Sequence, residues 1–376
     1  MKTAFTDLVG VPYPIVGFNR SPGVVAAVTN AGGLGVLAAS AYTPAELDAQ
    51  LTWIEDQTGG KPYGVDLLVP EKFTPGDPDH LVASLRAQIP AGHLAFVRDL
   101  LDRYGIPESP PHVSAAEHDE IAASLNPAGA AALLDVAFRH PISLVASALG
   151  IPPPGLVTRA KAEGVAVAAL VGQPRHAVRQ IEAGVDLLIA QGTEAGGHTG
   201  TIATMVLTPE IVDIAAGRPV LAAGGIASGR QMAAALALGA SGVWCGSVWL
   251  SSQEDVANQA IKDKFLQATS SDTVRSPTRT GKPARQLRSA WHEEWERPGS
   301  PAPLPLPLQP MLVNEAWQRI DAAAQAGHEG ALRLESFFVG QVVGSFQRIR
   351  PAAEITRQIV TDCEQRIADL ARGVTQ

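Results

Sequence analysis

The sequence predicts a TIM barrel, in which eight parallel strands are each followed by a helix. Short apolar runs alternate with helical patterns along most of the 376 residues. Several runs are apolar throughout, which is typical of parallel strands that are covered on both faces. A doubly wound parallel sheet is the alternative, because one sequence rarely determines topology. The expected strands are 14–17, 34–38, 63–68, 142–148, 166–171, 186–191, 219–223 and 242–245.

Helix signals lie between these runs, as alternating strands and helices require. Segment 21–30 is rich in alanine and valine and is followed by a pair of glycines. Thr43 and Pro44 form a cap followed by a first-turn proline, and Glu46 adds an acidic group to that turn. Further helices are expected at 174–183, from Thr208 onward, and from a Ser228 cap to Leu238.

Residues 70–140 interrupt this rhythm, because they are much too long for the connection within one βα unit. Apolar residues at helical spacing, from Leu94 to Tyr104, predict a helix within them. We therefore expect a helical insertion after the third strand. It would either cover one mouth of the barrel or serve only as a packing element.

A proline-rich segment at 297–310, RPGSPAPLPLPLQP, marks the end of the predicted barrel. Its prolines favour extended polyproline structure, since each fixes φ and lacks a backbone donor. The predicted division is a barrel over 1–290, which includes the insertion, and a C-terminal extension over 291–376. Helices at 313–326 and 351–372 are expected to pack on the side of the barrel.

Composition argues against several classes of function. The formal net charge of −8 does not support binding to nucleic acid, which usually requires a basic surface. Cys245 and Cys363 are the two cysteines and lie far apart, so neither a disulfide framework nor a cysteine metal site is expected. No signal-peptide pattern or membrane-spanning apolar run is found. We expect a cytoplasmic protein without a membrane partner, and homodimer formation is left open.

Small residues follow the last two expected strands, Ala-Ala-Gly-Gly at 222–225 and Gly-Ser at 246–247. In TIM barrels the loops after these strands often hold phosphate. Glycines let backbone N–H groups approach an anion closely, and the Ser247 hydroxyl adds a donor. Either pair alone could simply make a tight turn. Two pairs at successive strand ends favour a phosphorylated cofactor.

A glycine-rich loop, AQGTEAGGHTG at 190–200, contains His198 and follows the sixth expected strand. This end of a barrel strand is where catalytic residues lie. A lone histidine is ordinarily structural or exposed, but Gly196 and Gly197 carry no side chain that would block a planar ligand, which strengthens the catalytic interpretation of His198. No second histidine or carboxylate lies at metal-ligand spacing, so no metal site is expected. Glu194 is either an acid/base group or, as we favour, a helix-capping carboxylate.

Five basic side chains gather in the segment 274–288, VRSPTRTGKPARQLR, which we call the basic segment. In a protein of net negative charge, such a cluster could bind the phosphates of a dinucleotide or of coenzyme A. The alternative, of equal weight, is a solvated helix face with surface ion pairs.

Four motifs together carry a resemblance to a known family. They are NAGGLG at 30–35, AQGTEAGGH at 190–198, PVLAAGGIASGRQMAAALALGASGVWCGS at 219–247 and TGKPARQLR at 280–288. In this order they resemble the nitronate monooxygenase (2-nitropropane dioxygenase-like) family, from about residue 14 to 288 apart from the insertion. The resemblance implies a TIM barrel that binds FMN. Flavin-dependent enoyl reductases and NAD(P)H:quinone reductases share these motifs, so the reaction is less well specified than the family.

Carried over position by position, the resemblance implies that His198 is the catalytic base and that Ala195 and Gly196 lie beside the flavin ring. It implies polar flavin contacts at Gln191 and Asp66, where an ionised carboxylate would disfavour the anionic reduced flavin. The implied phosphate-binding backbone is that of Ala223, Gly224, Gly225, Gly246 and Ser247.

One departure from the family lies after the first strand. The family commonly has a glycine–methionine pair over the flavin, whereas this chain has Phe18, Asn19 and Arg20. Phe18 and Asn19 are therefore predicted at the cofactor, and the change alters the pocket in which substrate specificity is decided.

The expected activity is FMN-dependent oxidation of a nitroalkane or nitronate, with O2, to a carbonyl compound and nitrite. A second hypothesis is an NAD(P)H-dependent flavin reductase acting on an enoyl or other acyl thioester, or on a quinone. The basic segment and the insertion motivate this second hypothesis, because they could form a channel for the pantetheine arm of an acyl thioester. A third is a phosphate-ligand-binding barrel without catalysis, in which His198 is structural.

Overall fold

The computed structural model describes residues 1–67, 83–108, 127–147 and 150–374. Eight parallel strands close a barrel in the order β1-β2-β3-β4-β5-β6-β8-β9. The predicted TIM barrel is confirmed, because β1 pairs with both β2 and β9 and leaves no open sheet edge. The strands are β1 Ile15–Asn19, β2 Leu34–Ala38, β3 Gly64–Leu67, β4 Leu144–Ser147, β5 Ala166–Val171, β6 Leu187–Gln191, β8 Val220–Ala223 and β9 Gly242–Cys245.

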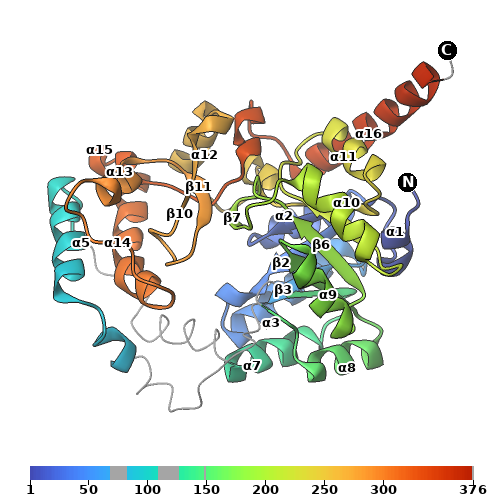
Figure 1. Cartoon of the computed structure of the whole chain (residues 1–376), viewed down its shortest axis with the longest axis horizontal. Helices are drawn as coiled ribbons and strands as arrows, with labels where there is room; N and C mark the ends of the chain where they lie inside the picture. The colour runs from blue at the N-terminus through green and yellow to red at the C-terminus, as the bar shows by residue number, and fades with distance from the viewer. Residues whose placement is uncertain (68–82, 109–126, 148–149, 375–376) are drawn as a thin grey trace.

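Helices cover the outside of the barrel (Figure 1). The expected cap at Thr43 is confirmed, and Glu46 completes a capping box with it at the start of α3. The expected helix start at Thr208 is wrong, because α10 already begins at Thr204 and contains Pro209. The helices are α1 Ala4–Val9, α2 Pro22–Asn30, α3 Pro44–Thr58, α7 Pro127–Ala137, α8 Pro154–Glu163, α9 Pro174–Glu182, α10 Thr204–Ile214 and α11 Gly229–Ala237, with 3-10 turns η1 Ala39–Ala41, η2 Ser247–Ser251, η3 Ser270–Asp272 and η4 Gln341–Ser345.

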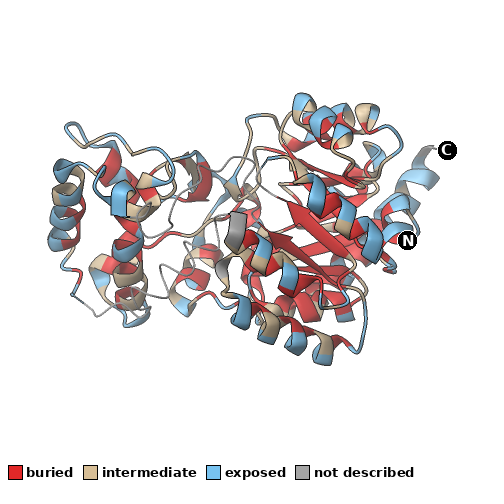
Figure 2. Ribbon diagram, turned by 90° about the horizontal axis from the view of Figure 1, so that it is seen from below, coloured by how far each residue is buried: buried red, intermediate tan, exposed pale blue. Residues whose placement is uncertain are grey.

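Side chains alternate along the strands between the barrel interior and the surrounding helices. Val36, Ala146 and Ala223 belong to the inner cluster of buried residues, whereas Val65 and Val145 pack outward under the helices. Figure 2 shows that the buried residues concentrate on the strands and on the helix faces turned toward them. This alternation determines which polar side chains can reach the barrel mouth.

A second body of helices stands beside the barrel, and we call it the helical lobe (Figure 1). It consists of α5 Ala91–Arg103, α13 Ala290–Glu296, α14 Leu308–Gln325 and α15 Glu329–Leu334. Buried residues of all four helices, including Leu100, Trp291 and Trp317, form its core. The helix predicted from the spacing of Leu94 to Tyr104 is confirmed as α5.

The C-terminal extension is divided between these two bodies. α14 packs on α5 and α15, not on the side of the barrel, because the apolar stripe of α5 faces it. α16, Ala352–Val374, packs on α11 and α2 of the barrel. α7 falls within the predicted insertion 70–140 but packs on α3 and β3, so it is a barrel helix. Much of the insertion lies outside the described residues, and the division at residue 290 stays a prediction.

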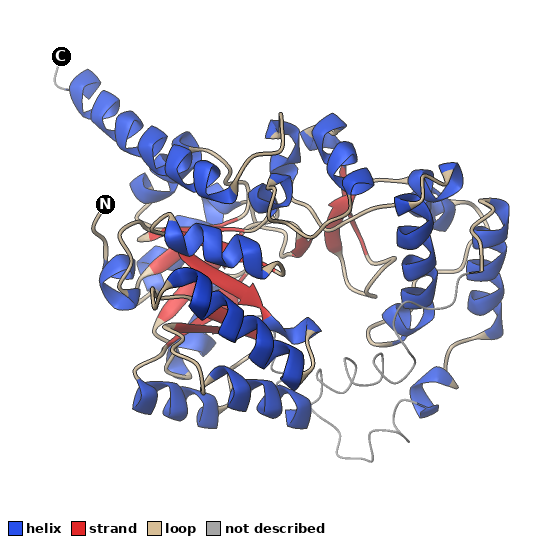
Figure 3. Cartoon of the chain, turned by 180° about the vertical axis from the view of Figure 1, so that it is seen from behind, coloured by secondary structure: helices blue, strands red, loops and turns tan. Residues whose placement is uncertain are grey.

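A small antiparallel sheet lies between the barrel and the helical lobe (Figure 3). Its strands are β10 Thr273–Ser276, β11 Ala284–Leu287 and β7 Gly197–His198, in the order β10-β11-β7. The basic segment is thus a hairpin, and the alternative of a solvated helix face is wrong, because its backbone pairs with the glycine-rich loop. α12, Gln259–Gln267, precedes the hairpin. None of the helices in the described ranges is long and apolar enough to span a bilayer.

Candidate active site at the barrel mouth

The loops after β6 and β8 meet at the C-terminal mouth of the barrel. Gly224 and Gly225 have φ angles of 95° and 73°, a left-handed region in which glycine is strongly favoured. A Cβ atom on Gly224 would lie 3.0 Å from the backbone nitrogen of Ala195 and 3.1 Å from the Gly192 carbonyl oxygen. Glycine at 224 therefore allows the loop carrying His198 to pack directly on the end of β8.

Free backbone donors gather at the ends of β8 and β9, which are neighbours in the barrel. Within the described part of the chain, the backbone N–H groups of Gly224, Gly225, Gly246 and Ser247 make no hydrogen bond. The Ser247 Oγ accepts a 2.8 Å bond from the Gly340 N–H, which leaves the serine proton available. This donor set fits a phosphate group, because unpaired N–H groups favour an anion.

Asp66 and Gln191 supply polar groups to the inside of the mouth. Asp66 pairs in register with inward-facing Ala146, and Gln191 pairs with Ala223, so both side chains face the interior. Burial raises the pKa of Asp66 from 3.8 to about 7. No hydrogen bond or ion pair reaches its carboxyl from the residues that the structure describes. The protonated form of Asp66 can donate a hydrogen bond, and with this pKa both the protonated and the ionised forms are populated near neutral pH.

Phe18 and Asn19, predicted at the cofactor, face different surroundings. The Phe18 ring packs inside the barrel, with its centroid 5.6 Å from that of Trp244. Asn19 is buried; its Nδ2 donates to Asp255 Oδ2 at 2.8 Å, and its Oδ1 accepts from the Ser21 N–H at 2.7 Å. The Asn19 amide is thus satisfied by the protein itself, and its contact with a cofactor stays a prediction.

His198 projects from β7, where it pairs with Ala284 of β11. Its Nε2 lies 2.9 Å from the Thr280 Oγ1. Desolvation by the surrounding protein lowers the pKa of His198, and the positive charge of Lys282 lowers it further, although the residue keeps an exposed surface. A neutral imidazole at neutral pH is the form that can accept a proton.

Glu194 is a helix cap, as favoured from the sequence. Its carboxylate accepts hydrogen bonds from the Thr204 N–H at 2.9 and 3.1 Å and from the Thr204 hydroxyl at 2.9 Å. Since Thr204 is the first residue of α10, the negative charge lies at the positive end of that helix. The Glu194 carboxylate uses its hydrogen bonds to hold the loop on α10, which argues against a role in acid/base catalysis.

Gly196 is required by protein packing as well as by any ligand. A Cβ atom there would lie 2.9 Å from the Gly340 nitrogen and 3.0 Å from the Val339 Cα. The segment before η4 therefore runs directly over the glycine-rich loop, a contact that sequence reasoning missed. The place of Gly196 and Ala195 beside a flavin ring stays a prediction.

The basic segment ties the loop down through backbone carbonyls. Arg285 Nε donates to the Thr193 carbonyl at 2.8 Å, and an Arg275 nitrogen donates to the Thr199 carbonyl at 2.9 Å. These bonds bracket His198 on both sides. The sequence revealed the cluster of arginines but not their partners. Every residue has a backbone carbonyl, so the sequence cannot indicate which carbonyl an arginine will bind.

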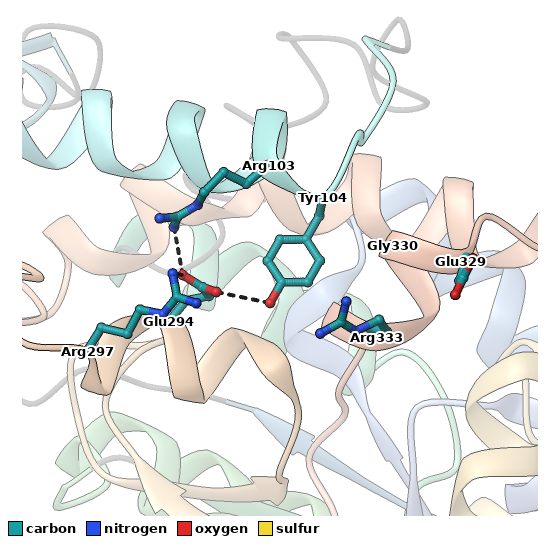
Figure 4. Close-up of a pocket in the computed structure, with 7 residues that line it drawn as sticks. All are labelled: Arg103, Tyr104, Glu294, Arg297, Glu329, Gly330 and Arg333. Atoms are coloured by element: carbon teal, nitrogen blue, oxygen red, sulfur yellow. Dashed lines mark hydrogen bonds and ion pairs between the residues drawn. The ribbon is translucent and has the colours of Figure 1, made fainter.

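A pocket of about 430 Å³ lies in the helical lobe, away from the mouth (Figure 4). Buried Glu294 accepts from Arg103 at 2.7 Å and from the Tyr104 hydroxyl at 3.0 Å, and it pairs with Arg297 at 3.1 Å. This carboxylate is ion-paired with both arginines and joins α5 to α13, so the pocket is lined by a structural ion-pair network.

The described residues contain no group of histidine, cysteine, aspartate or glutamate that could hold a metal ion. Both cysteines are free and buried. Burial raises the pKa of Cys245 to about 12, which keeps it a thiol and argues against a nucleophilic role.

The comparison with protein families agrees with this geometry. A family model described as nitronate monooxygenase matches residues 2–362. The chain belongs to the nitronate monooxygenase family. Members of this family are flavin-dependent oxidoreductases. The chain is 54% identical, over all of both sequences, to Rv1533 of Mycobacterium tuberculosis, which is provisionally named a monooxygenase.

The names of other relatives point to two kinds of enzyme, nitronate monooxygenases and a carboxyl-CoA dehydrogenase. A "probable nitronate monooxygenase" of Staphylococcus saprophyticus is 30% identical, over 84% of this chain and 86% of its own length. An octahydroindene-carboxyl-CoA dehydrogenase of Rhodococcus jostii is 31% identical, over 80% of this chain and 69% of its own length. Among solved structures, nitroalkane oxidase from Streptomyces ansochromogenes is 27% identical with a TM-score of 0.77, covering 98% of this chain and 100% of the other.

Proposed function

We propose that this protein is an FMN-dependent nitronate monooxygenase that oxidises nitroalkanes or nitronates, with O2, to carbonyl compounds and nitrite. The observation that carries the proposal is a histidine with a lowered pKa at the barrel mouth where β8 and β9 present unpaired N–H donors. Family membership and the likeness to a nitroalkane oxidase support the substrate class.

In this proposal, different residues of the chain would bind the cofactor, move the substrate proton and exclude water. The backbone of Gly224, Gly225, Gly246 and Ser247 would hold the FMN phosphate, and Asp66 and Gln191 would offer polar contacts to its ring system. Bound FMN would supply the electron-transfer chemistry. His198 would remove the acidic α-proton of a nitroalkane or orient a bound nitronate. The inner apolar layer with Phe18 would exclude water from the mouth.

His198→Asn tests this assignment. We expect the variant to keep its yellow, FMN-bound state and to lose nitroalkane turnover by on the order of 100- to 10,000-fold, the usual contribution of a general base. His176→Asn on α9 is the matched control and should keep full activity. Colourless His198→Asn protein, or unchanged turnover, would contradict the proposed role.

A second candidate is an NAD(P)H-dependent flavin reductase acting on an enoyl or other acyl thioester, or on a quinone. The relative named as a carboxyl-CoA dehydrogenase supports a thioester substrate. Anaerobic titration separates the two candidates. Bleaching of the flavin by a nitronate alone supports the first, and bleaching by NADH or NADPH supports the second.

Three further expectations belong to this proposal. O2 is the electron acceptor of the first candidate. The protein works in the cytoplasm, where two distant thiols stay reduced. Association into a homodimer is compatible with both candidates and can be measured by sedimentation.

A further inference from the structure

The hydrogen bonds of Thr280 determine which nitrogen of His198 carries a proton. A threonine hydroxyl has one proton to donate and two lone pairs that accept. Thr280 Oγ1 lies 2.9 Å from the Lys282 carbonyl oxygen, which can only accept, so the hydroxyl proton points there. The Lys282 N–H donates to the same hydroxyl at 3.4 Å.

The contact between Thr280 and His198 must therefore run in the opposite direction. With its proton committed to the Lys282 carbonyl, Thr280 Oγ1 can only accept from His198 Nε2, 2.9 Å away. A neutral imidazole has one N–H and one lone pair. If Nε2 holds the proton, the basic lone pair is on Nδ1.

The turn that carries Thr280 is held from several sides. The N–H groups of Thr280 and Gly281 both donate to the Pro277 carbonyl, at 3.2 and 2.8 Å. Gly281 has a φ of 77°, and a Cβ atom there would lie 2.4 Å from the Leu306 nitrogen. Gln309 Nε2 donates to the Thr278 carbonyl at 2.7 Å. The proline-rich segment thus braces the turn, and Thr280 presents its hydroxyl from a fixed position.

The charges around this contact favour the neutral imidazole. Arg275, Arg279, Lys282 and Arg285 are the charged groups on the hairpin whose strand β11 pairs with β7, and all four are cationic. Arg275 and Arg285 donate to loop carbonyls on either side of His198. Lys282 lowers the pKa of the histidine directly. No acidic partner in the described residues draws a second proton onto the ring.

We propose that Thr280 is a positioning residue that fixes His198 in the Nε2–H tautomer and leaves Nδ1 as the atom that accepts the substrate proton. The inference rests on the proposed function, in which His198 is the base. The α-carbon–hydrogen bond of the nitroalkane breaks, and its electron pair forms the carbon–nitrogen double bond of the nitronate. The negative charge goes to the nitro oxygens. The proton goes to Nδ1, and the imidazolium still donates from Nε2 to Thr280.

The test observes the tautomer directly, in the FMN-loaded protein. Long-range proton–nitrogen NMR correlations of 15N-histidine-labelled protein distinguish a protonated from an unprotonated ring nitrogen, and His198→Asn identifies the signal. We expect Nε2 to be protonated and Nδ1 to be bare above the pKa of His198. An Nδ1–H tautomer in the wild type would overturn the inference, whatever the activity.

Two variants add a functional readout. Thr280→Val keeps the shape but removes the acceptor, so we expect mixed tautomers and a kcat for nitroalkane lowered about tenfold with little change in KM. Thr280→Ser retains the hydroxyl and should recover the single tautomer and most of the lost kcat. A single Nε2–H tautomer in Thr280→Val would also overturn the inference. If Thr280→Val does not fold, the spectra of the wild type and of Thr280→Ser still show which ring nitrogen of His198 carries the proton.

Failure of the proposed function gives a different result. If His198→Asn leaves nitroalkane turnover unchanged, His198 is not the base and the assignment of Nδ1 as proton acceptor falls with it. The NMR spectrum then still decides whether Thr280 fixes the ring, since it requires no turnover.

Discussion

Asp66 shows how its surroundings change the chemistry of a single residue. The carboxyl lies inside the barrel among apolar side chains, 5% exposed, and burial alone raises its pKa to about 7. In the unfolded chain its pKa is near 3.8. Between these two pH values the unfolded state loses a proton that the folded state keeps, so rising pH destabilises the fold.

Replacing Asp66 by asparagine should remove this pH dependence. From pH 5 to pH 8, we expect the free energy of unfolding of the wild type to fall relative to that of Asp66→Asn by on the order of 2–3 kcal/mol. The dependence should level off above the folded-state pKa. Urea unfolding across this pH range measures it. Parallel pH curves for the two proteins would show that Asp66 is not the group responsible.

At the scale of secondary-structure elements, the cap on α10 connects the active-site loop to the barrel. Glu194 accepts a hydrogen bond from the first N–H of the helix, and the Thr204 hydroxyl also lies 3.2 and 3.0 Å from the carbonyl oxygens of Ala223 and Gly224. One threonine therefore links the glycine-rich loop, α10 and the end of β8.

Glu194→Ala should lower the free energy of unfolding by about 1–2 kcal/mol, the usual cost of a lost helix cap with its favourable charge. Glu194→Gln keeps an acceptor and should lose less. Glu210→Ala, an exposed position of the same helix, is the matched control and should be nearly neutral. Thermal unfolding measures all three. Equal losses at 194 and 210 would argue against the capping role.

At the scale of the whole molecule, Arg279 joins the helical lobe to the sheet that carries His198. Its guanidinium stacks 3.9 Å from the centroid of the Trp317 ring on α14 and 4.9 Å from that of Phe338, and it donates to the Ser336 carbonyl at 3.1 Å. Desolvation lowers the pKa of Arg279 to about 10, so it stays charged at neutral pH. The lobe is thereby held against the hairpin by a cation that contacts two aromatic rings.

Arg279→Lys should weaken this attachment, because an ammonium group lacks the planar face that stacks on tryptophan. We expect a loss of about 1–2 kcal/mol in the free energy of unfolding, followed by tryptophan fluorescence in denaturant. Arg98→Lys on the exposed face of α5 is the control and should leave stability unchanged. A similar effect of both substitutions would rule out a special role for the stack.

The sequence alone predicted the barrel and several local features of the loops at its mouth. Apolar runs revealed the strands because parallel strands are buried on both faces. Glu194 was recognised as a cap, and Gly224 and Gly225 as a turn that brings backbone donors to a strand end. These features are local, since each depends on residues close together in the chain.

Only the tertiary structure decided which elements bury one another. Periodicity shows that α5 and α14 each have an apolar face, but not that they face each other rather than the barrel. Two contacts join residues that lie far apart in the sequence, one between Gly340 and Gly196 and the other between Thr280 and His198. Such contacts depend on shape and on backbone carbonyls, neither of which leaves a pattern in the chain. The tautomer of His198 is therefore a property of the fold.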